Sequence, residues 1–180
     1  GCTSLVRAPL IPALTSANSC FLSMFQGCTA LTDPPYLDAT TLVDACYKSM
    51  FKGCTSLVKA PDLPAQTLTA NCYQEIFSGC TLLNEVHVDA TDISATDCLT
   101  DWLNGVASSG NFYCALGVNF PVDSVSGIPQ GWTVIRSIIE STNLPLYLKS
   151  TQNGSTITLS QTNSEDVFEI SSDNTTWETA

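Results

Sequence analysis

Positive charge is scarce in this sequence of 180 residues. There are 6 lysines and arginines against 17 aspartates and glutamates, and the formal net charge is -11. Such an acidic chain does not suit nucleic acid, because few cations are available to replace the counterions of the phosphates. It suits an anionic membrane surface no better, and no apolar run approaches the length of a membrane-spanning helix. The sequence therefore predicts neither a nucleic-acid partner nor a membrane span.

The motifs of common active sites and metal sites are also missing. The sequence contains no Gly-x-Ser-x-Gly, no phosphate-binding loop and no Gly-x-Gly-x-x-Gly. No two cysteines are closer than eight positions, which excludes a Cys-x-x-Cys for zinc or redox chemistry. The single histidine, His87, has no nucleophile near it and is a weak candidate for catalysis. We therefore expect no enzyme activity, no catalytic residue, no metal and no cofactor.

What the sequence has instead is a fixed period. The stretch from Cys46 to Leu57 recurs at 20–31 and at 72–83, a step of twenty-six positions each time. A fixed period of this size is typical of a solenoid, in which each repeat buries one face by stacking on its neighbours. Two series of cysteines keep the step, namely Cys2, Cys28, Cys54 and Cys80, and Cys20, Cys46, Cys72 and Cys98.

This regular spacing decides how the cysteines are interpreted. Cysteines at equivalent places in stacked coils are expected to be small buried side chains that form ladders of free thiols. Disulfides are the alternative, and they would mainly involve Cys114, which stands outside both series. The aromatic residues that follow the helix cysteines, at Phe21, Tyr47 and Tyr73, could form a binding stripe, but burial between coils is the preferred interpretation.

Within one repeat the signals predict a helix, a stop and a short strand. Thr41 and Asp44 resemble a capping box, and Gly53 would end the helix in the left-handed conformation. The stretch 57–61 reads as a strand ended by proline. Apolar residues at steps of four would form the inner face of the helix, namely Leu42, Cys46 and Met50. Strand, return and helix within one period predict an α/β solenoid with parallel strands and right-handed coils.

This pattern resembles a known family. The motif Met-Phe-x-Gly-Cys-Thr-x-Leu-x-x-Ala/Pro-Pro at 24–35 and 50–61 is similar to the BspA-like, Treponema-type leucine-rich repeats of surface proteins from gut Bacteroidetes. The resemblance covers about residues 1–133. It implies a right-handed leucine-rich-repeat solenoid that is exported to the bacterial cell surface, is not catalytic and contacts extracellular host or bacterial proteins or glycans. It implies no particular ligand and no particular site residue.

The sequence changes character after the repeats, which predicts three parts. We expect a capped solenoid at 1–133, a connector at 134–143 and a β segment at 144–180. Trp102, where the first two repeats have methionine (Met24 and Met50), is expected to help cap the last coil. Asn153-Gly154 between two strand-like runs, 147–151 and 156–160, is a strong hairpin signal. With a third strand at 167–171 this would be a small antiparallel segment, marginal as a domain on its own.

The two ends of the sequence carry separate expectations. No signal peptide is recognisable, but Gly1 already falls inside a repeat, so we expect the sequence to belong to a longer chain. The first coil has no predecessor in this sequence, and its strand edge at 5–9 is expected to be exposed and to mediate self-association.

One column of the predicted strands is the candidate binding face. At the step of the repeat it contains Arg7, Asp33, Lys59 and Glu85, whose charges alternate in sign. Neighbours in parallel coils lie about 5 Å apart, so opposite charges there would attract each other. We therefore expect an exposed ladder of ion pairs, with Asp33 between Arg7 and Lys59.

His87 completes the candidate face, because it lies two positions after Glu85 in an acidic stretch. A calcium site formed with the nearby aspartates is one interpretation, but calcium wants six or more converging oxygens, usually from a loop with glycine. The stretch has no glycine, so a solvated acidic surface is favoured. The function we expect is adhesion or binding at the cell surface. The alternative is a structural spacer that presents the C-terminal β segment.

Overall fold

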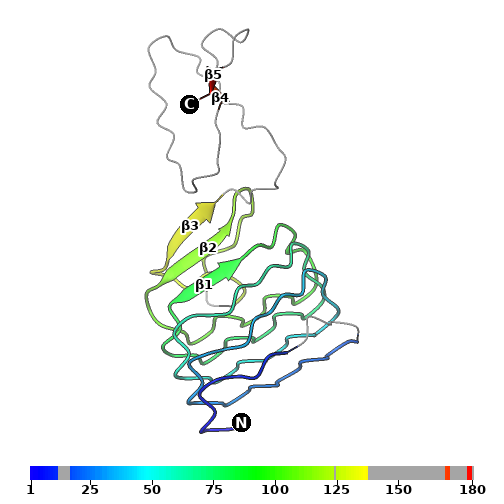
Figure 1. Ribbon diagram of the computed structural model, residues 1–180, viewed down its shortest axis with the longest axis vertical. Helices are drawn as coiled ribbons and strands as arrows, with labels where there is room; N and C mark the ends of the chain where they lie inside the picture. Colours follow the sequence, from blue (N-terminus) through cyan, green and yellow to red (C-terminus); the bar gives the residue numbers. More distant parts are fainter. Residues whose placement is uncertain (12–16, 124, 138–168, 171–177, 180) are drawn as a thin grey trace. The chain divides into compact units, whose positions relative to one another are not determined.

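The computed structural model describes residues 1–11, 17–123, 125–137, 169–170 and 178–179. The chain divides into two compact units, Gly1–Ser141 and Thr142–Ala180. In the first unit, successive turns of the chain stack on one another, as Figure 1 shows. We call each of these stacked windings a coil and number them coil 1 (residues 2–27), coil 2 (28–53), coil 3 (54–79) and coil 4 (80–105).

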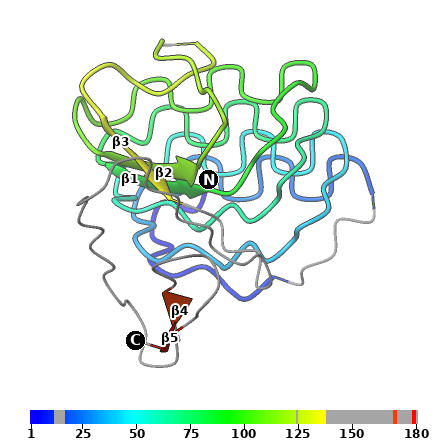
Figure 2. The same ribbon diagram turned by 90° about the horizontal axis from the view of Figure 1, so that it is seen from above.

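One side of the stack carries a parallel sheet of three short strands in the order β1-β2-β3. The strands are β1 (Glu85–Val88), β2 (Asn111–Ala115) and β3 (Thr133–Ser137), and seen from above they lie over one another (Figure 2). In coils 1 to 3 the same side makes only single parallel bridges, such as Arg7 to Asp33 and Lys59 to Glu85. Residues 134–137, which the sequence placed in a connector, are part of β3.

The predicted fold class is wrong, because no helix occurs in the described residues and their strands are few and short. Within the stretches expected to be helical, such as 42–53, the chain forms runs of turns, in this case at 44–53. The N–H of every second residue donates to the carbonyl three positions before it, as Leu22 does to Ser19 and Met24 to Phe21. The intervening N–H groups donate to the next coil. A helix would bond every N–H within its own segment, so the hydrogen bonds between coils replace half of the helical ones.

These turns need a left-handed residue at every fourth position. Residues other than glycine adopt φ of 53–59° there, and Gly27, Gly53, Gly79 and Gly105 complete the four series at φ of 70–76°. The glycine taken for a helix stop is thus the last of several equivalent positions. The members other than glycine are Ser19, Ser23, Ala45, Ser49, Asn71, Glu75, Asp97 and Asp101.

The predicted capping residues also have other partners. The carboxylate of Asp44 accepts a hydrogen bond from the N–H of Ala70 in the next coil, at 3.2 Å. Ser94, expected to start a last helix, instead bonds Asp92 through both its N–H and its hydroxyl. These polar side chains therefore do not cap helices. One forms a hydrogen bond to the next coil, and the other forms hydrogen bonds within its own coil.

The core is built from columns of equivalent residues. The expected burial of the aromatic column is confirmed, since Phe21, Tyr47 and Tyr73 are buried and stack in order with ring centroids 5.5 and 6.2 Å apart. All nine cysteines are free thiols. The expectation that all are buried is wrong for two of them, because Cys2 and Cys20 in coil 1 are exposed.

Aromatic residues close the far end of the stack. Trp102 is fully buried, packs edge-on against Phe112 and donates its indole N–H to the carbonyl of Gly127 at 3.0 Å. Trp132 likewise donates to the carbonyl of Ala107 at 2.8 Å. These hydrogen bonds and ring contacts hold the segment that follows coil 4 against coil 4.

In the second unit the structure describes only β4 (Glu169–Ile170) and β5 (Glu178–Thr179), which pair antiparallel. The hairpin predicted at 147–160 lies outside the described residues. So does most of the third strand predicted at 167–171, of which 169–170 form β4.

Candidate functional site

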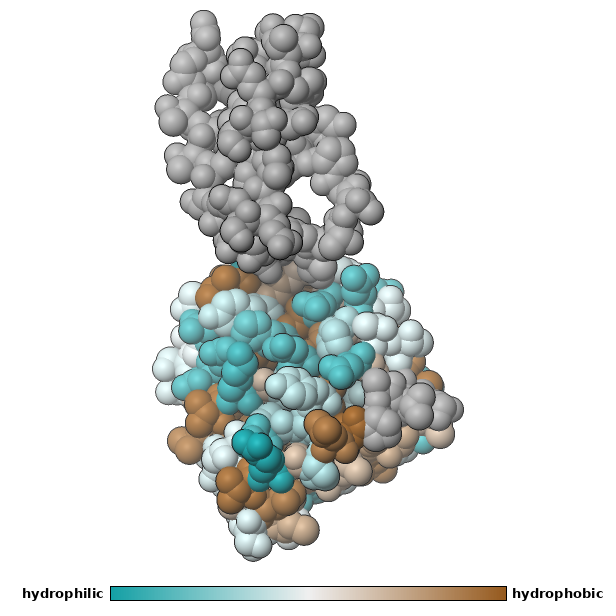
Figure 3. Space-filling model, viewed as in Figure 1, coloured by the Kyte–Doolittle hydropathy of each residue, from teal (hydrophilic) through white to brown (hydrophobic). Residues whose placement is uncertain are grey.

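The strand side of the stack gathers charged and aromatic side chains from coil 3, coil 4 and β2. We call this surface the charged face and define it by six residues: Lys59, Asp62, Glu85, His87, Asp89 and Tyr113. In the view of Figure 3, hydrophilic residues gather over the region of β1 and β2, and hydrophobic ones form separate small groups. The charged face is therefore a polar surface and not an apolar one.

Strand alternation turns these side chains outward. Along β1, Val86 and Val88 are buried, whereas Glu85 and His87 between them are half-buried. In β2, Phe112 and Cys114 are buried on either side of Tyr113. Because successive side chains of a strand point to opposite faces, the apolar residues fix the polar ones on the outside.

A one-residue irregularity adds Asp62 to the charged face. Lys59 bridges Glu85 at the full step of the repeat, but Leu63 bridges Val88, one position short of that step. Coil 3 therefore has one more residue than coil 4 between the two bridges, as in a β-bulge. Asp62 in this irregular stretch is exposed and lies close enough to act electrostatically on Lys59 and Asp89.

Glu85 is the centre of the hydrogen bonding. Its Oε1 accepts from Lys59 Nζ at 2.8 Å and lies 3.1 Å from His87 Nε2. The hydrogen bond from Lys59, followed by that from His87, lowers the pKa of Glu85, although its partial burial acts in the opposite direction. The same bond raises the pKa of Lys59. Glu85 therefore remains a carboxylate, and Lys59 a cation, at neutral pH.

Asp89 differs from Glu85 in the direction of its pKa shift. Removal from water, followed by the charge of Asp62, raises its pKa, and His87 offsets part of this effect. Among the described residues, Asp62 and Asp89 form no ion pair. These two carboxylates therefore give the charged face negative charge for which the described residues supply no ion-pair partner.

The column of alternating charges forms two separate pairs. Arg7 Nε lies 2.6 Å from Asp33 Oδ2, and Lys59 pairs with Glu85. Among the described residues, neither an ion pair nor a main-chain bond joins Asp33 to Lys59, so the expected continuous ladder is wrong at this step. The cause is Pro34. Ala8 and Ala60, at the equivalent positions, donate N–H groups to the next coil, and proline has none.

The rings of His87 and Tyr113 stack on the charged face. Their centroids are 4.0 Å apart with an angle of 18° between the planes, and the two residues are partners in the β1–β2 register. One face of each ring is therefore covered by the other. Tyr113 pairs with Ile135 of β3 on its other side, so ring edges are more available than ring faces.

The sequence analysis named Lys59, Glu85 and His87 and missed Asp62 and Tyr113. Tyr113 could have been found, because it follows His87 at the step of the repeat. Asp62 could not have been found. Its position on the charged face depends on the one-residue irregularity between coils 3 and 4, which the regular repeat step does not predict. Arg7 and Asp33 lie in the same column but form their own pair in coils 1 and 2.

The described residues contain no group of His, Cys, Asp or Glu that could hold a metal ion. Within the described residues, the carboxylates of the charged face therefore do not form a metal site. Within the described parts of the chain there is also no helix long and apolar enough to cross a membrane.

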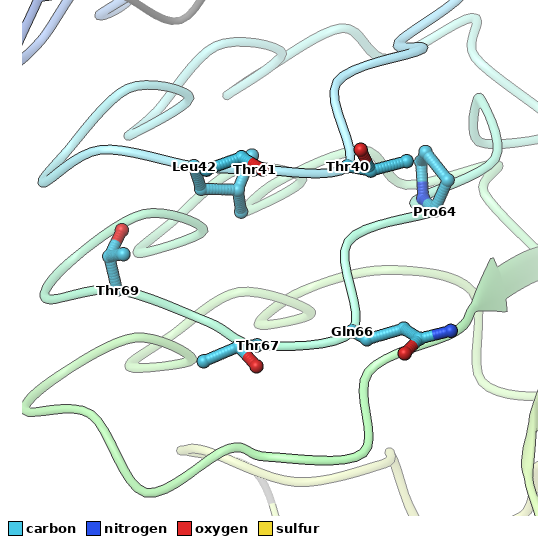
Figure 4. A pocket seen from close by; sticks show the side chains of 7 residues that line it. All are labelled: Thr40, Thr41, Leu42, Pro64, Gln66, Thr67 and Thr69. Atoms are coloured by element: carbon cyan, nitrogen blue, oxygen red, sulfur yellow. The ribbon is translucent and has the colours of Figure 1, made fainter.

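Two hollows are found elsewhere on the described surface. The larger, about 590 Å³, lies between two successive coils and is lined by Thr40, Thr41, Leu42, Pro64, Gln66, Thr67 and Thr69 (Figure 4). The second, about 520 Å³, lies between the end of coil 4 and the segment that closes it, and Asp123 is its one charged residue. Neither hollow contains a residue of the charged face.

Comparisons with protein-family models, with curated proteins and with solved structures found no match. The resemblance to BspA-like repeats stays a prediction.

Proposed function

We propose that this protein is a non-catalytic binding module that uses the charged face to bind an extracellular protein. The observation that carries the proposal is the grouping of Asp62 and Asp89, which lack ion-pair partners in the described structure, with the bonded set Lys59, Glu85 and His87. These charges come from adjacent coils and share one surface. The resemblance to exported surface proteins supports a location at a bacterial cell surface.

The support beneath the charged face favours binding. Val86, Val88 and Phe112 lie under it with at most 1% of their surface exposed, and main-chain bonds link β1 to β2 over four residue pairs. A surface held in this way loses little conformational entropy when a partner binds. It is also not one of the two described hollows, which suits a macromolecule better than a small molecule.

The chemistry of the charged face favours a cationic segment of a protein over a glycan. A sugar would need an open ring face on which to stack, and the facing sides of His87 and Tyr113 are covered. Lysine or arginine side chains of a partner would pair with Asp62 and Asp89. The net charge of -11 would also speed the approach of a cationic partner.

The test is binding of the immobilised protein to extracellular matrix proteins, a lysine-rich peptide and a panel of glycans. The double variant Asp62→Asn/Asp89→Asn removes the two unpaired charges. Its matched control, Asp38→Asn/Asp97→Asn, removes the same charge from exposed residues outside the charged face. We expect the first variant to weaken binding of the lysine-rich peptide by about tenfold, as loss of about 1.4 kcal/mol would, and the control to change it little.

Three outcomes would contradict this proposal. Equal weakening by both variants would show that only net charge matters. Binding of glycans that neither variant changes would move the site elsewhere. Absence of any binding at micromolar concentration would favour the structural spacer.

A further inference from the structure

Coil 2 contributes an exposed tyrosine that the six residues of the charged face do not include. Tyr36 is 76% exposed, and none of the described residues stacks on its ring. Its exposure does not depend on where the sequence begins, because Leu10 of coil 1 occupies the equivalent position one repeat step earlier. Both side chains nevertheless remain exposed. Tyr36 therefore offers an aromatic ring that the described part of the chain leaves uncovered.

The repeat places the Tyr36 ring next to the carboxylate of Asp62. The two residues are one repeat step apart, and each is exposed between two buried neighbours, namely Pro35 and Leu37 in coil 2 and Pro61 and Leu63 in coil 3. Because successive side chains of an extended segment point to opposite sides, both side chains point outward from equivalent positions. Equivalent core rings of coils 2 and 3 lie 6.2 and 5.6 Å apart, which gives the scale of the separation between the two positions.

His87 lies on the other side of Asp62. The bridge between Leu63 and Val88 places the residues that precede them side by side, and these are Asp62 and His87. Tyr113 of β2 covers the face of the His87 ring that is turned away from coil 3. The opposite face is therefore turned toward coil 3, and the carboxylate of Asp62 lies in a row between two aromatic rings.

We propose that Tyr36 and Asp62 form a site for an arginine side chain of the partner protein, an inference that rests on the proposed function of the charged face. A guanidinium group can stack on an aromatic ring and donate two parallel hydrogen bonds to a carboxylate at the same time. A lysine ammonium is a compact, strongly hydrated charge that does not match a ring and a carboxylate together. Lys59 Nζ bonds Glu85 at 2.8 Å and forms no ion pair with Asp62.

Charge favours an arginine over a sugar at this site. A sugar could stack on the Tyr36 ring and donate a hydroxyl to Asp62. Only a cation, however, is attracted both by the negative face of the ring and by the charge of the carboxylate. A cation bound to Asp62 would lie about 5–6 Å from the ring, within the range of a cation–π interaction. The unpaired carboxylate and the uncovered ring therefore act on the same ligand.

The test measures binding of two peptides of equal length and charge, one rich in arginine and one rich in lysine, to the complete chain. We expect the parent to bind the arginine-rich peptide about threefold more tightly, as an exposed cation–π contact would give. Tyr36→Leu should remove this preference with less effect on the lysine-rich peptide, and Tyr36→Phe should retain it. The control is Leu82→Ala, at an exposed apolar residue outside the charged face, and it should change neither affinity.

The outcomes separate this inference from the proposed function. Equal affinity of the parent for the two peptides would overturn the arginine site, and so would a preference that Tyr36→Leu keeps. In either case, binding of the lysine-rich peptide that Asp62→Asn/Asp89→Asn weakens would still support the proposed function. Binding of a glycan that Tyr36→Leu abolishes would assign the ring to a sugar and overturn the arginine site. Binding of neither peptide would overturn both proposals.

Discussion

At the scale of single residues, backbone conformation at Ala45 is informative. Ala45 has φ of 56°, a conformation that costs an L-residue roughly 1–2 kcal/mol and glycine almost nothing. We therefore expect Ala45→Gly to stabilise the protein by up to about 1 kcal/mol, after allowing for the lost methyl group and the greater freedom of the unfolded chain. Denaturant unfolding measures the change.

Ala65→Gly is the matched control for this substitution. Ala65 is fully buried and does not have a positive φ, so glycine there should destabilise the protein. If Ala45→Gly destabilised it to a similar degree, the positive φ of Ala45 would be contradicted, because glycine relieves backbone strain only where φ is positive.

Glu75 makes a second prediction at this scale, on pH. It accepts hydrogen bonds from Lys52 Nζ at 2.6 Å and from Ser49 Oγ at 2.9 Å, and these bonds, that from Lys52 first, lower its pKa below the ordinary 4.5. A lowered pKa stabilises the folded protein at neutral pH. That stabilisation is lost as the pH falls below the ordinary pKa and through the pKa of the folded state.

We expect Glu75→Gln to lower the free energy of unfolding at neutral pH by at most about 1 kcal/mol, since the pair is partly exposed. The difference from the parent should shrink as the pH falls below the ordinary pKa. Asp38→Asn, at an exposed residue, serves as the control. A difference that stayed constant with pH would mean that glutamine disturbs packing and that the charge is unimportant.

At the scale of elements, Pro34 interrupts the strand side between coils 2 and 3. None of the described residues donates a main-chain hydrogen bond to the carbonyl of Lys59, whereas the equivalent carbonyls of Asp33 and Glu85 accept from Ala8 and Ala60. Pro34→Ala supplies the missing N–H. A hydrogen bond contributes about 0.5–1.5 kcal/mol, part of which is lost to the greater freedom of the unfolded chain.

Pro64→Ala is the control, because no main-chain hydrogen bond to a neighbouring coil is expected from residue 64. It therefore measures only the stability lost to the greater freedom of the unfolded chain. We predict that Pro34→Ala is more stable than Pro64→Ala in parallel denaturant titrations. An amide of residue 34 that exchanges with solvent as fast as an unprotected loop would contradict the prediction, because the new N–H would then have found no acceptor.

The repeat, the outward charge column and the buried aromatic column could be predicted from the sequence, because each depends only on residues at a fixed step. The helices could not. Leu42, Cys46 and Met50 are all buried, as a helix with apolar residues at steps of four would require. A four-residue turn that repeats along the segment buries the same residues.

A helix and a repeating four-residue turn differ in the acceptors of every second N–H group, which lie within the segment in a helix and in the next coil here. The pattern of apolar residues does not reveal this difference. A clue was present in the other positions. Ser49 and Gly53 in coil 2, like Asn71 and Gly79 in coil 3, are separated by multiples of four positions. Asparagine and glycine tolerate positive φ well. Reading these positions together, and not only the glycine, would have favoured turns.

At the scale of the whole molecule, net charge and ion pairs act in opposite directions. The chain carries a net charge of -11, which repels itself and destabilises the compact state. The ion pairs on the strand side are exposed, with 82% and 49% of the Arg7 and Asp33 side chains accessible, and exposed pairs contribute only about 0–1 kcal/mol each. Repulsion between unpaired carboxylates should therefore outweigh them.

Salt screens both the repulsion between carboxylates and the attraction within ion pairs. The direction in which the melting temperature changes with salt therefore shows which of the two is larger. We expect the melting temperature to rise as salt increases from about 10 mM to about 150 mM, where the Debye length falls from about 30 Å to about 8 Å. Asp62→Asn/Asp89→Asn, which removes two unpaired charges, should reduce the rise. Arg7→Gln, which removes a cation from an exposed pair, should increase it. A melting temperature that fell with salt would show that the ion pairs between coils contribute more than the repulsion, and that the charge column holds the stack together.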